Sequence, residues 1–193
     1  PLHKTAAFGW FKKAAEQGNA VAQFNCGNMC FKGEGTAQDK TAAFGWYKKA
    51  AEQGHATAQF ACGSMLDNGE GVPQDKAAAF GWYQKAAEQG DPDAQFWCGS
   101  MYNAGEGVPQ DKAAAFGWYK KAAERGDAVA QLKCGDMCYN GEGTGEDKAV
   151  AFGWYQKAAE QGSMIARFRC GAMLDSGEGV AVDKAAAFGW YQK

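Results

Sequence analysis

Seven cysteines and two histidines are the residues of this chain best suited to bind a metal or to act as nucleophiles. Five of the cysteines recur every 36 residues, and two more follow the first and fourth of these by four residues: Cys26, Cys62, Cys98, Cys134 and Cys170, then Cys30 and Cys138. Two thiolates on one helical face could supply part of a zinc site. No histidine or further cysteine is placed to complete it, so we expect no metal and no cofactor. We interpret the cysteines as small buried apolar residues, with a partial metal site as the alternative.

An odd number of cysteines without obvious pairs is a poor disulfide framework. Equivalent residues on packed helices lie roughly 8–10 Å apart. Cα atoms joined by a disulfide generally lie within about 7 Å of each other. We therefore expect the periodic cysteines to remain unbridged.

The acidic residues and histidines do not form a catalytic set. One glutamate recurs in each Gly-Glu-Gly segment, at Glu34, Glu70, Glu106, Glu142 and Glu178. General acid–base catalysis needs a carboxylate positioned beside a second reacting group, and these stand singly. His3 and His55 both fall at expected helix starts, and the Gly-Glu-Gly segments lack the Lys-Ser/Thr of a phosphate-binding loop. We expect no catalytic residues and no enzyme activity.

The composition narrows the range of partners. The chain has 193 residues and a formal net charge of −2, which argues against nucleic acid as a partner. No apolar run approaches the roughly 20 residues of a membrane span, so we expect no direct membrane insertion. The first residue is Pro1, and Lys193 falls inside a repeat, which indicates a fragment or a processed chain. Buried free thiols weakly favour a reducing intracellular compartment, while the endoplasmic reticulum lumen and secretion stay open.

A repeat of 36 residues must position all these side chains. The tripeptide Phe-Gly-Trp recurs at this spacing six times, starting at Phe8. The chain is predicted to be a single repeat domain, 1–193, with units 4–39, 40–75, 76–111, 112–147 and 148–183 and a partial unit 184–193. A fixed period of this length is typical of a repeat architecture in which stacked units share a core.

Each unit is predicted to be a pair of helices. In unit 40–75, Asp39 is a helix N-cap, the first helix ends near Gln53, and a second helix runs from His55 to Asn68. The first unit has His3 in place of the aspartate cap. On a helical wheel, Ala43, Trp46, Tyr47 and Ala50 form the arc that faces the second helix, and Ala58, Cys62, Met65 and Leu66 face back.

The repeated residues resemble those of the Sel-1-like repeat family, a relative of the tetratricopeptide repeats. The resemblance rests on Ala43-x-x-Trp46-Tyr47-x-Lys49-Ala50-Ala51-Glu52-x-Gly54, followed by Ala58-Gln59, Gly63, Gly69-x-Gly71-Val72 and Asp75. It covers essentially the whole chain and implies an all-α, right-handed superhelical solenoid. It also implies a role as an adaptor or scaffold for protein assemblies. A bacterial branch of the family joins the two helices of a unit by disulfides, but the first helices here contain no cysteine.

Phe-Gly at family positions that usually vary is the strongest candidate for a binding surface. The candidates are Phe8, Phe44, Phe80, Phe116, Phe152 and Phe188 with Gly45, Gly81, Gly117 and Gly153. In one interpretation the phenylalanines fill the seam between consecutive first helices. In another they border a groove with a glycine floor, where a ligand approaches the bare backbone. Recent duplication, which copies residues whether or not they matter, is a third account.

Trp97 is a further candidate, because it falls outward on a second helix at a position that differs between units. The predicted function is a non-catalytic adaptor or scaffold that binds other proteins or peptides, either alone or as a subunit of a larger complex. The alternatives are a structural spacer within an assembly and an interaction module of a larger signalling or enzyme polypeptide.

Overall fold

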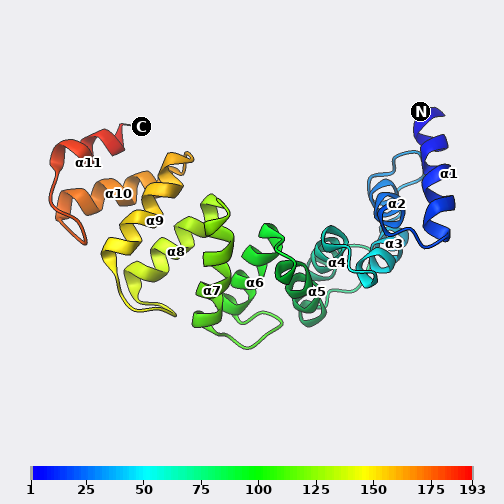
Figure 1. The fold of residues 1–193 in the computed structure, drawn as a ribbon, viewed down its shortest axis with the longest axis horizontal. Coiled ribbons are helices and arrows are strands. Elements are labelled where there is room, and N and C mark those ends of the chain that lie inside the picture. Colours follow the sequence, from blue (N-terminus) through cyan, green and yellow to red (C-terminus); the bar gives the residue numbers. More distant parts are fainter. Residues whose placement is uncertain (1, 193) are drawn as a thin grey trace. The chain divides into compact units, whose positions relative to one another are not determined.

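The computed structural model describes residues 2–192, and within this range the chain forms eleven helices and no strands (Figure 1). The helices are α1 (Leu2–Glu16), α2 (Ala20–Lys32), α3 (Lys40–Glu52), α4 (Ala56–Asn68), α5 (Lys76–Glu88), α6 (Pro92–Ala104), α7 (Lys112–Glu124), α8 (Ala128–Asn140), α9 (Lys148–Glu160), α10 (Met164–Ser176) and α11 (Lys184–Tyr191). Odd-numbered helices are the first helices of the repeats, and even-numbered helices are the second.

The helices pack as two compact units, each of which contains several repeats. One contains α1 to α5 and α6 as far as Ala94, together with Glu106–Val108, and the other contains the remaining residues from Gln95 onward. Within each unit, neighbouring helices in the sequence pack against each other, as α2 does against α1 and α3 and as α8 does against α7 and α9.

Local sequence signals set the ends of the helices as predicted. The Asp39 carboxylate accepts a hydrogen bond from the Ala42 backbone N–H at 2.8 Å, and His55 Nδ1 accepts one from Ala58 N–H at 3.3 Å. These bonds satisfy backbone donors that the first turn leaves free. Gly69 ends α4 with φ of 69°, a left-handed conformation that glycine adopts readily. The prediction for the first unit was wrong, because α1 begins at Leu2 and His3 lies inside it.

The core of a repeat consists of alanine, cysteine, methionine and tyrosine. Ala43, Ala50, Ala58 and Cys62 are fully buried, as the wheel predicted, and small side chains let the two helices approach closely. Trp46 remains half-buried and also packs on the Ala15, Ala22 and Cys26 cluster of the preceding repeat. Trp46 therefore contacts the cores of two consecutive repeats.

Tyrosine has a second role that the helical wheel did not show. The ring of Tyr83 lies so close over Gly63 of the preceding repeat that a Cβ there would come within 2.7 Å of it. The same packing recurs for Tyr119 over Gly99. The Tyr47 hydroxyl also donates to Asn28 Oδ1 of the preceding repeat at 2.8 Å. The tyrosine thus holds consecutive repeats together as well as packing on its own second helix.

Buried glutamines form a second link between repeats. Gln59 Nε2 donates to the Ala51 carbonyl at 3.1 Å, and Gln59 Oε1 accepts from Gln89 Nε2 of the next repeat at 2.7 Å. Equivalent pairs of bonds centre on Gln23 and Gln131. The glutamine side chain is buried at this position, and a buried polar group without a hydrogen-bond partner destabilises the fold. These bonds therefore matter for the stability of the contact between repeats.

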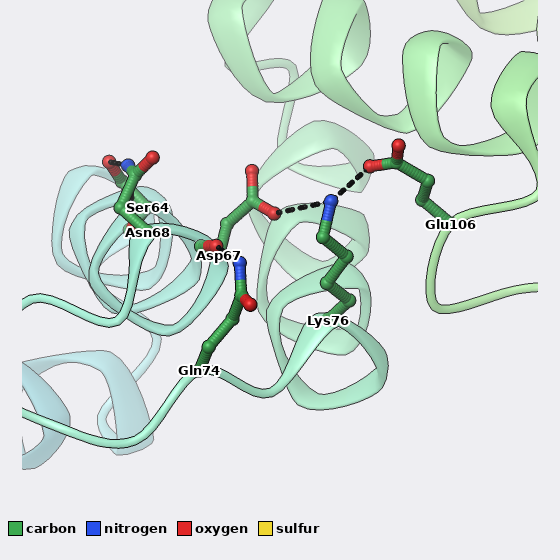
Figure 2. Close-up of polar contacts among 6 residues, drawn as sticks. All are labelled: Ser64, Asp67, Asn68, Gln74, Lys76 and Glu106. Carbon is green, nitrogen blue, oxygen red and sulfur yellow. Dashed lines mark hydrogen bonds and ion pairs between the residues drawn. The ribbon is translucent and has the colours of Figure 1, made fainter.

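The Gly-Glu-Gly loops dock on the first helix of the same repeat. Figure 2 shows Lys76 at the start of α5 between Asp67, 3.9 Å away, and Glu106, to which it donates a hydrogen bond. Gln74 Nε2 donates to the Asp67 carbonyl at 2.6 Å (Figure 2). The lysine–glutamate pair recurs 30 residues apart between Lys40 and Glu70, at 3.1 Å.

Candidate binding surface

Two phenylalanines of the Phe-Gly pairs, Phe8 and Phe116, lie in the seam between consecutive repeats. Phe8 packs on the Ala15, Ala22 and Cys26 cluster of its own repeat and on the core cluster of α3 and α4. Phe116 likewise packs on the α7/α8 core and on the α9/α10 core. Five of the six phenylalanines remain half-buried, namely Phe8, Phe44, Phe80, Phe116 and Phe152, whereas Phe188 is 61% exposed. Seam packing and a partly accessible ring therefore coexist in the same residue.

The glycines of these pairs have open space beside them. A Cβ built on Gly45, Gly81, Gly117 or Gly153 would meet no atom within 4 Å beyond its own helix turn. Each lies in the interior of a first helix, at a right-handed helical conformation. Neither sterics nor backbone geometry inside the protein requires glycine at these four positions.

A lysine covers the tryptophan that follows each glycine. Lys49 Nζ lies 4.5 Å from the ring centroid of Trp46, and Lys121 Nζ lies 3.8 Å from that of Trp118. Equivalent contacts form at Trp10, Trp82 and Trp154. These distances are those of cation–π contacts. The sequence reasoning missed these lysines, although the three-residue spacing from tryptophan to lysine recurs in every repeat and is a signal for such a pair.

Charged pairs flank this surface. Lys48 and Glu52 form an ion pair at 3.9 Å within α3, and Lys120 and Glu124 do so within α7. Lys48 and Lys120 are therefore paired with carboxylates. The lysines that cover the tryptophan rings, in contrast, have no ion-pair partner within the described chain. We call the Phe, Gly, Trp and Lys residues of the 44-, 45-, 46- and 49-type positions the first-helix face.

Trp97 does not belong to the first-helix face. It lies on α6, a second helix, where it is 39% exposed and meets Phe96 edge-on with ring centroids 5.9 Å apart. The structure thus assigns the predicted candidates to two kinds of helix.

The cysteines are all buried and unbridged. Burial raises the pKa of the Cys62 and Cys134 thiols to about 12, and it raises that of Cys26 and Cys170 to about 11. They therefore carry a proton at neutral pH, whereas a nucleophile or metal ligand needs the thiolate. Among residues 2–192 no group of three or more His, Cys, Asp or Glu side chains could hold a metal ion. His55 acts as a helix cap rather than as part of such a group.

A model of the Sel1 repeat matches six consecutive segments of the chain, at residues 4–19, 20–55, 56–91, 92–127, 128–163 and 165–193. The chain belongs to the Sel1 repeat family. Its complete matched segments are 36 residues long, the period of Phe-Gly-Trp, although they begin at the second helices. The family resemblance predicted from the repeated residues is confirmed. A comparison with curated protein sequences gave no significant match.

Solved structures of Sel1 repeat proteins match this fold closely. A protective antigen of uropathogenic Escherichia coli strains, which displays an SLR fold, is 42% identical with a TM-score of 0.91, over 96% of this chain and 40% of that one. A Sel1 repeat protein from Oxalobacter formigenes is 31% identical with a TM-score of 0.87, over 97% of this chain and 83% of that one. The chain thus spans well under half of the length of the Escherichia coli antigen. The predicted all-helical solenoid fold is confirmed.

Sel1 repeat proteins are generally protein-interaction modules. No helix within residues 2–192 has the length and apolar character needed to cross a membrane.

Proposed function

We propose that this Sel1 repeat chain is a non-catalytic adaptor or scaffold that binds another protein on its first-helix face. We treat residues 1–193 as one repeat domain of five units and a partial sixth. The first-helix face recurs in both of the described units, so a partner can engage several repeats at once. Family membership supports a protein or peptide as the partner.

The glycines carry this proposal. Gly63 is needed because the Tyr83 ring lies on it, and Gly71 is needed because the Lys40 backbone lies against it. Gly45 has no such neighbour, yet glycine in a helix interior costs roughly 1 kcal/mol relative to alanine. The same cost recurs in every repeat. A partner that must approach the helix backbone closely explains why it is retained.

The neighbouring side chains suit such a partner. Half-buried phenylalanine and tryptophan rings offer rigid apolar area, which contributes strongly to protein interfaces. Lysines such as Lys49 and Lys85 offer positive charge that no carboxylate of the described chain neutralises. Because the face is almost identical from repeat to repeat, it suits a partner that is itself repetitive.

The test replaces Gly45, Gly81, Gly117 and Gly153 together by alanine in the tagged full-length protein. Companions of the native and variant proteins are purified from the source organism and quantified by mass spectrometry. We expect a stoichiometric companion on the native protein, reduced about tenfold or more on the variant, because added methyl groups prevent close approach. Gly145→Ala is the matched control, since Gly145 also has open space and lies in a loop.

An equal yield of the companion from native and variant proteins would overturn the assignment of the first-helix face. Recovery of the native chain alone, at every salt concentration tested, would overturn the stable scaffold itself. Crosslinks from the companion to residues near Phe44 or Phe116 would support both statements.

A further inference from the structure

A groove with apolar walls lies between α2 and α4, the second helices of two consecutive repeats. Its volume is about 300 Å³, within the range of small ligand sites. Its walls include three phenylalanines, a tyrosine, an alanine and a methionine: Phe24, Phe31, Phe60, Tyr47, Ala61 and Met65. We call this the α2/α4 groove. Apart from Tyr47 of α3 and Glu70 of the following loop, its lining residues lie on second helices, and none of them belongs to the first-helix face.

Ala61, which lines the groove, is the smallest residue at its position in the five repeats. The other repeats have larger residues at this position: Asn25, Trp97, Lys133 and Arg169. The corresponding space between α6 and α8 includes Lys133 among its walls, and its volume is about 100 Å³. Its other walls include Asp136, Asn140 and Glu142, so that smaller space is also strongly polar. The larger and more apolar of the two spaces is thus the one that has alanine at this position.

The edge of the α2/α4 groove carries one uncompensated positive charge. Glu70 lines the groove, but Lys40 neutralises it at 3.1 Å while resting 5.1 Å from the Phe31 ring centroid. Lys32 also lines the groove, is exposed, and has no carboxylate partner within the described chain. The other repeats have Asn, Ala or Ser in place of Lys32. The charge is thus particular to the groove that is open.

Asn28 adds a hydrogen-bond donor to the groove. Its Oδ1 accepts from the Tyr47 hydroxyl at 2.8 Å, which fixes the orientation of the carboxamide. The Nδ2 group, which carries two protons, then remains available to a backbone carbonyl. Apolar walls, an oriented amide and one cation together match the parts of a peptide.

We infer that the α2/α4 groove binds a short peptide segment of a partner protein that places a bulky apolar side chain beside an Asp or Glu. The apolar side chain enters between Phe24, Phe31 and Phe60. The carboxylate pairs with Lys32, and Asn28 donates to the segment's backbone. Charge complementarity with Lys32 selects an acidic segment over a basic one.

The probe is a phage-displayed library of random peptides about 12 residues long, selected on the native 193-residue chain. Enriched sequences are synthesised with a fluorescein label and titrated by fluorescence anisotropy. We expect enriched peptides to combine an aromatic or large aliphatic residue with a neighbouring Asp or Glu. Ala61→Trp should weaken their binding about tenfold or more by filling the groove, and Lys32→Glu should weaken it several-fold.

Lys133→Trp is the matched control, because it makes the same residue at the equivalent position of another repeat and should leave binding unchanged. Circular dichroism and a urea transition verify that Ala61→Trp folds, and Trp97 shows that a repeat accommodates tryptophan at this position. Ala61→Lys, which introduces the residue type found at Lys133, provides a second groove-filling variant. Failure to enrich peptides, or equal binding to the native chain and a folded Ala61 variant, would overturn the inference.

A second copy of the chain is the other candidate occupant. Sedimentation velocity distinguishes it, since a dimer that Ala61→Trp dissociates would also overturn binding of a partner peptide. The four glycine substitutions of the first-helix face should leave peptide binding unchanged. The experiments can therefore contradict the peptide site in the α2/α4 groove without contradicting the proposed function, and the reverse.

Discussion

Glycine has several physical roles in each repeat, and the side-chain environment separates them. At Gly63 the Tyr83 ring occupies the space that a Cβ would need, whereas at Gly45 that space is empty. Both glycines lie inside helices, and sequence alone cannot tell them apart. The difference is set by the next repeat, whose tyrosine reaches one glycine and not the other.

This difference gives opposite predictions for one substitution. Gly63→Ala should destabilise the protein by about 1–3 kcal/mol, because the new methyl group must displace the buried Tyr83 ring. Gly45→Ala should stabilise it by up to about 1 kcal/mol, because alanine favours the helix and meets no neighbour. Urea denaturation of the two variants and the native chain measures both changes. A loss of stability in Gly45→Ala would show that this glycine has a structural role.

The buried thiols predict a loss of stability at alkaline pH. In the unfolded chain these thiols titrate near pH 9, but burial raises the pKa of Cys62 and Cys134 to about 12 in the folded protein. Between these values the unfolded state releases protons that the folded state keeps, so stability present below pH 9 is lost as the pH rises toward 12.

We expect the urea midpoint to fall between about pH 7.5 and about pH 10 by more in the native chain than in the double variant Cys62→Ala and Cys134→Ala. Lysine titration affects both proteins alike, so the difference between the two falls isolates the thiols. The same fall in both proteins would contradict a contribution from the thiols.

At the scale of the helix, nearly all boundaries could be predicted from the sequence. Asp39 and Asp75 cap first helices, and Gly69 ends a second helix, because these effects depend on a few adjacent residues. The cap predicted at His3 fails because α1 extends beyond it to Leu2. Histidine is a weaker helix N-cap than aspartate, so the sequence marked the beginning of α1 less clearly.

We expect the docking of the loop at Gly107 to depend on close packing more than on charge. Gly107 lies against the Lys76 backbone, too close for a side chain, whereas the Lys76–Glu106 pair is largely exposed (Figure 2). We expect Gly107→Ala to lower the urea midpoint clearly and Glu106→Ala to leave it almost unchanged, since exposed ion pairs contribute little. The reverse order of effects would show that the ion pair holds the loop.

At the scale of the whole molecule, stability should grow with the number of repeats. Each repeat contributes its own core and an interface with its neighbour, formed by the Tyr83–Gly63 contact and the Gln59–Gln89 bond in one instance. Insertion of a second copy of residues 40–75 between Asp75 and Lys76 should therefore raise the guanidinium midpoint, with unchanged helicity per residue. A lower midpoint would show that the added interface is not formed.

The period predicted the fold, yet it could not predict how repeats contact one another. A helical wheel assigns Tyr47 and Gln59 to faces, but each repeat presents the same faces again, so a face can meet its own repeat or the next. For the candidate surface, the Phe-Gly positions could be identified because every repeat has Phe-Gly where the family usually varies. The α2/α4 groove could not be found, since it depends on the small side chain of Ala61 and on how two helices of consecutive repeats pack.

The glutamine link also has a direction, and this bears on how the gene could gain or lose copies of the repeat. Gln59 and Gln131 each donate to their own repeat and accept from the following one. Recombination that places a repeat with a glutamine donor, such as Gln89 or Gln161, after either of them keeps the bond between repeats. Arg167 occupies the same position and donates to the Ala159 carbonyl at 3.3 Å, but a guanidinium cannot accept. A copy carrying Arg167 placed ahead of another glutamine would oppose donor to donor, so a repeat added directly after Arg167 would lack this bond.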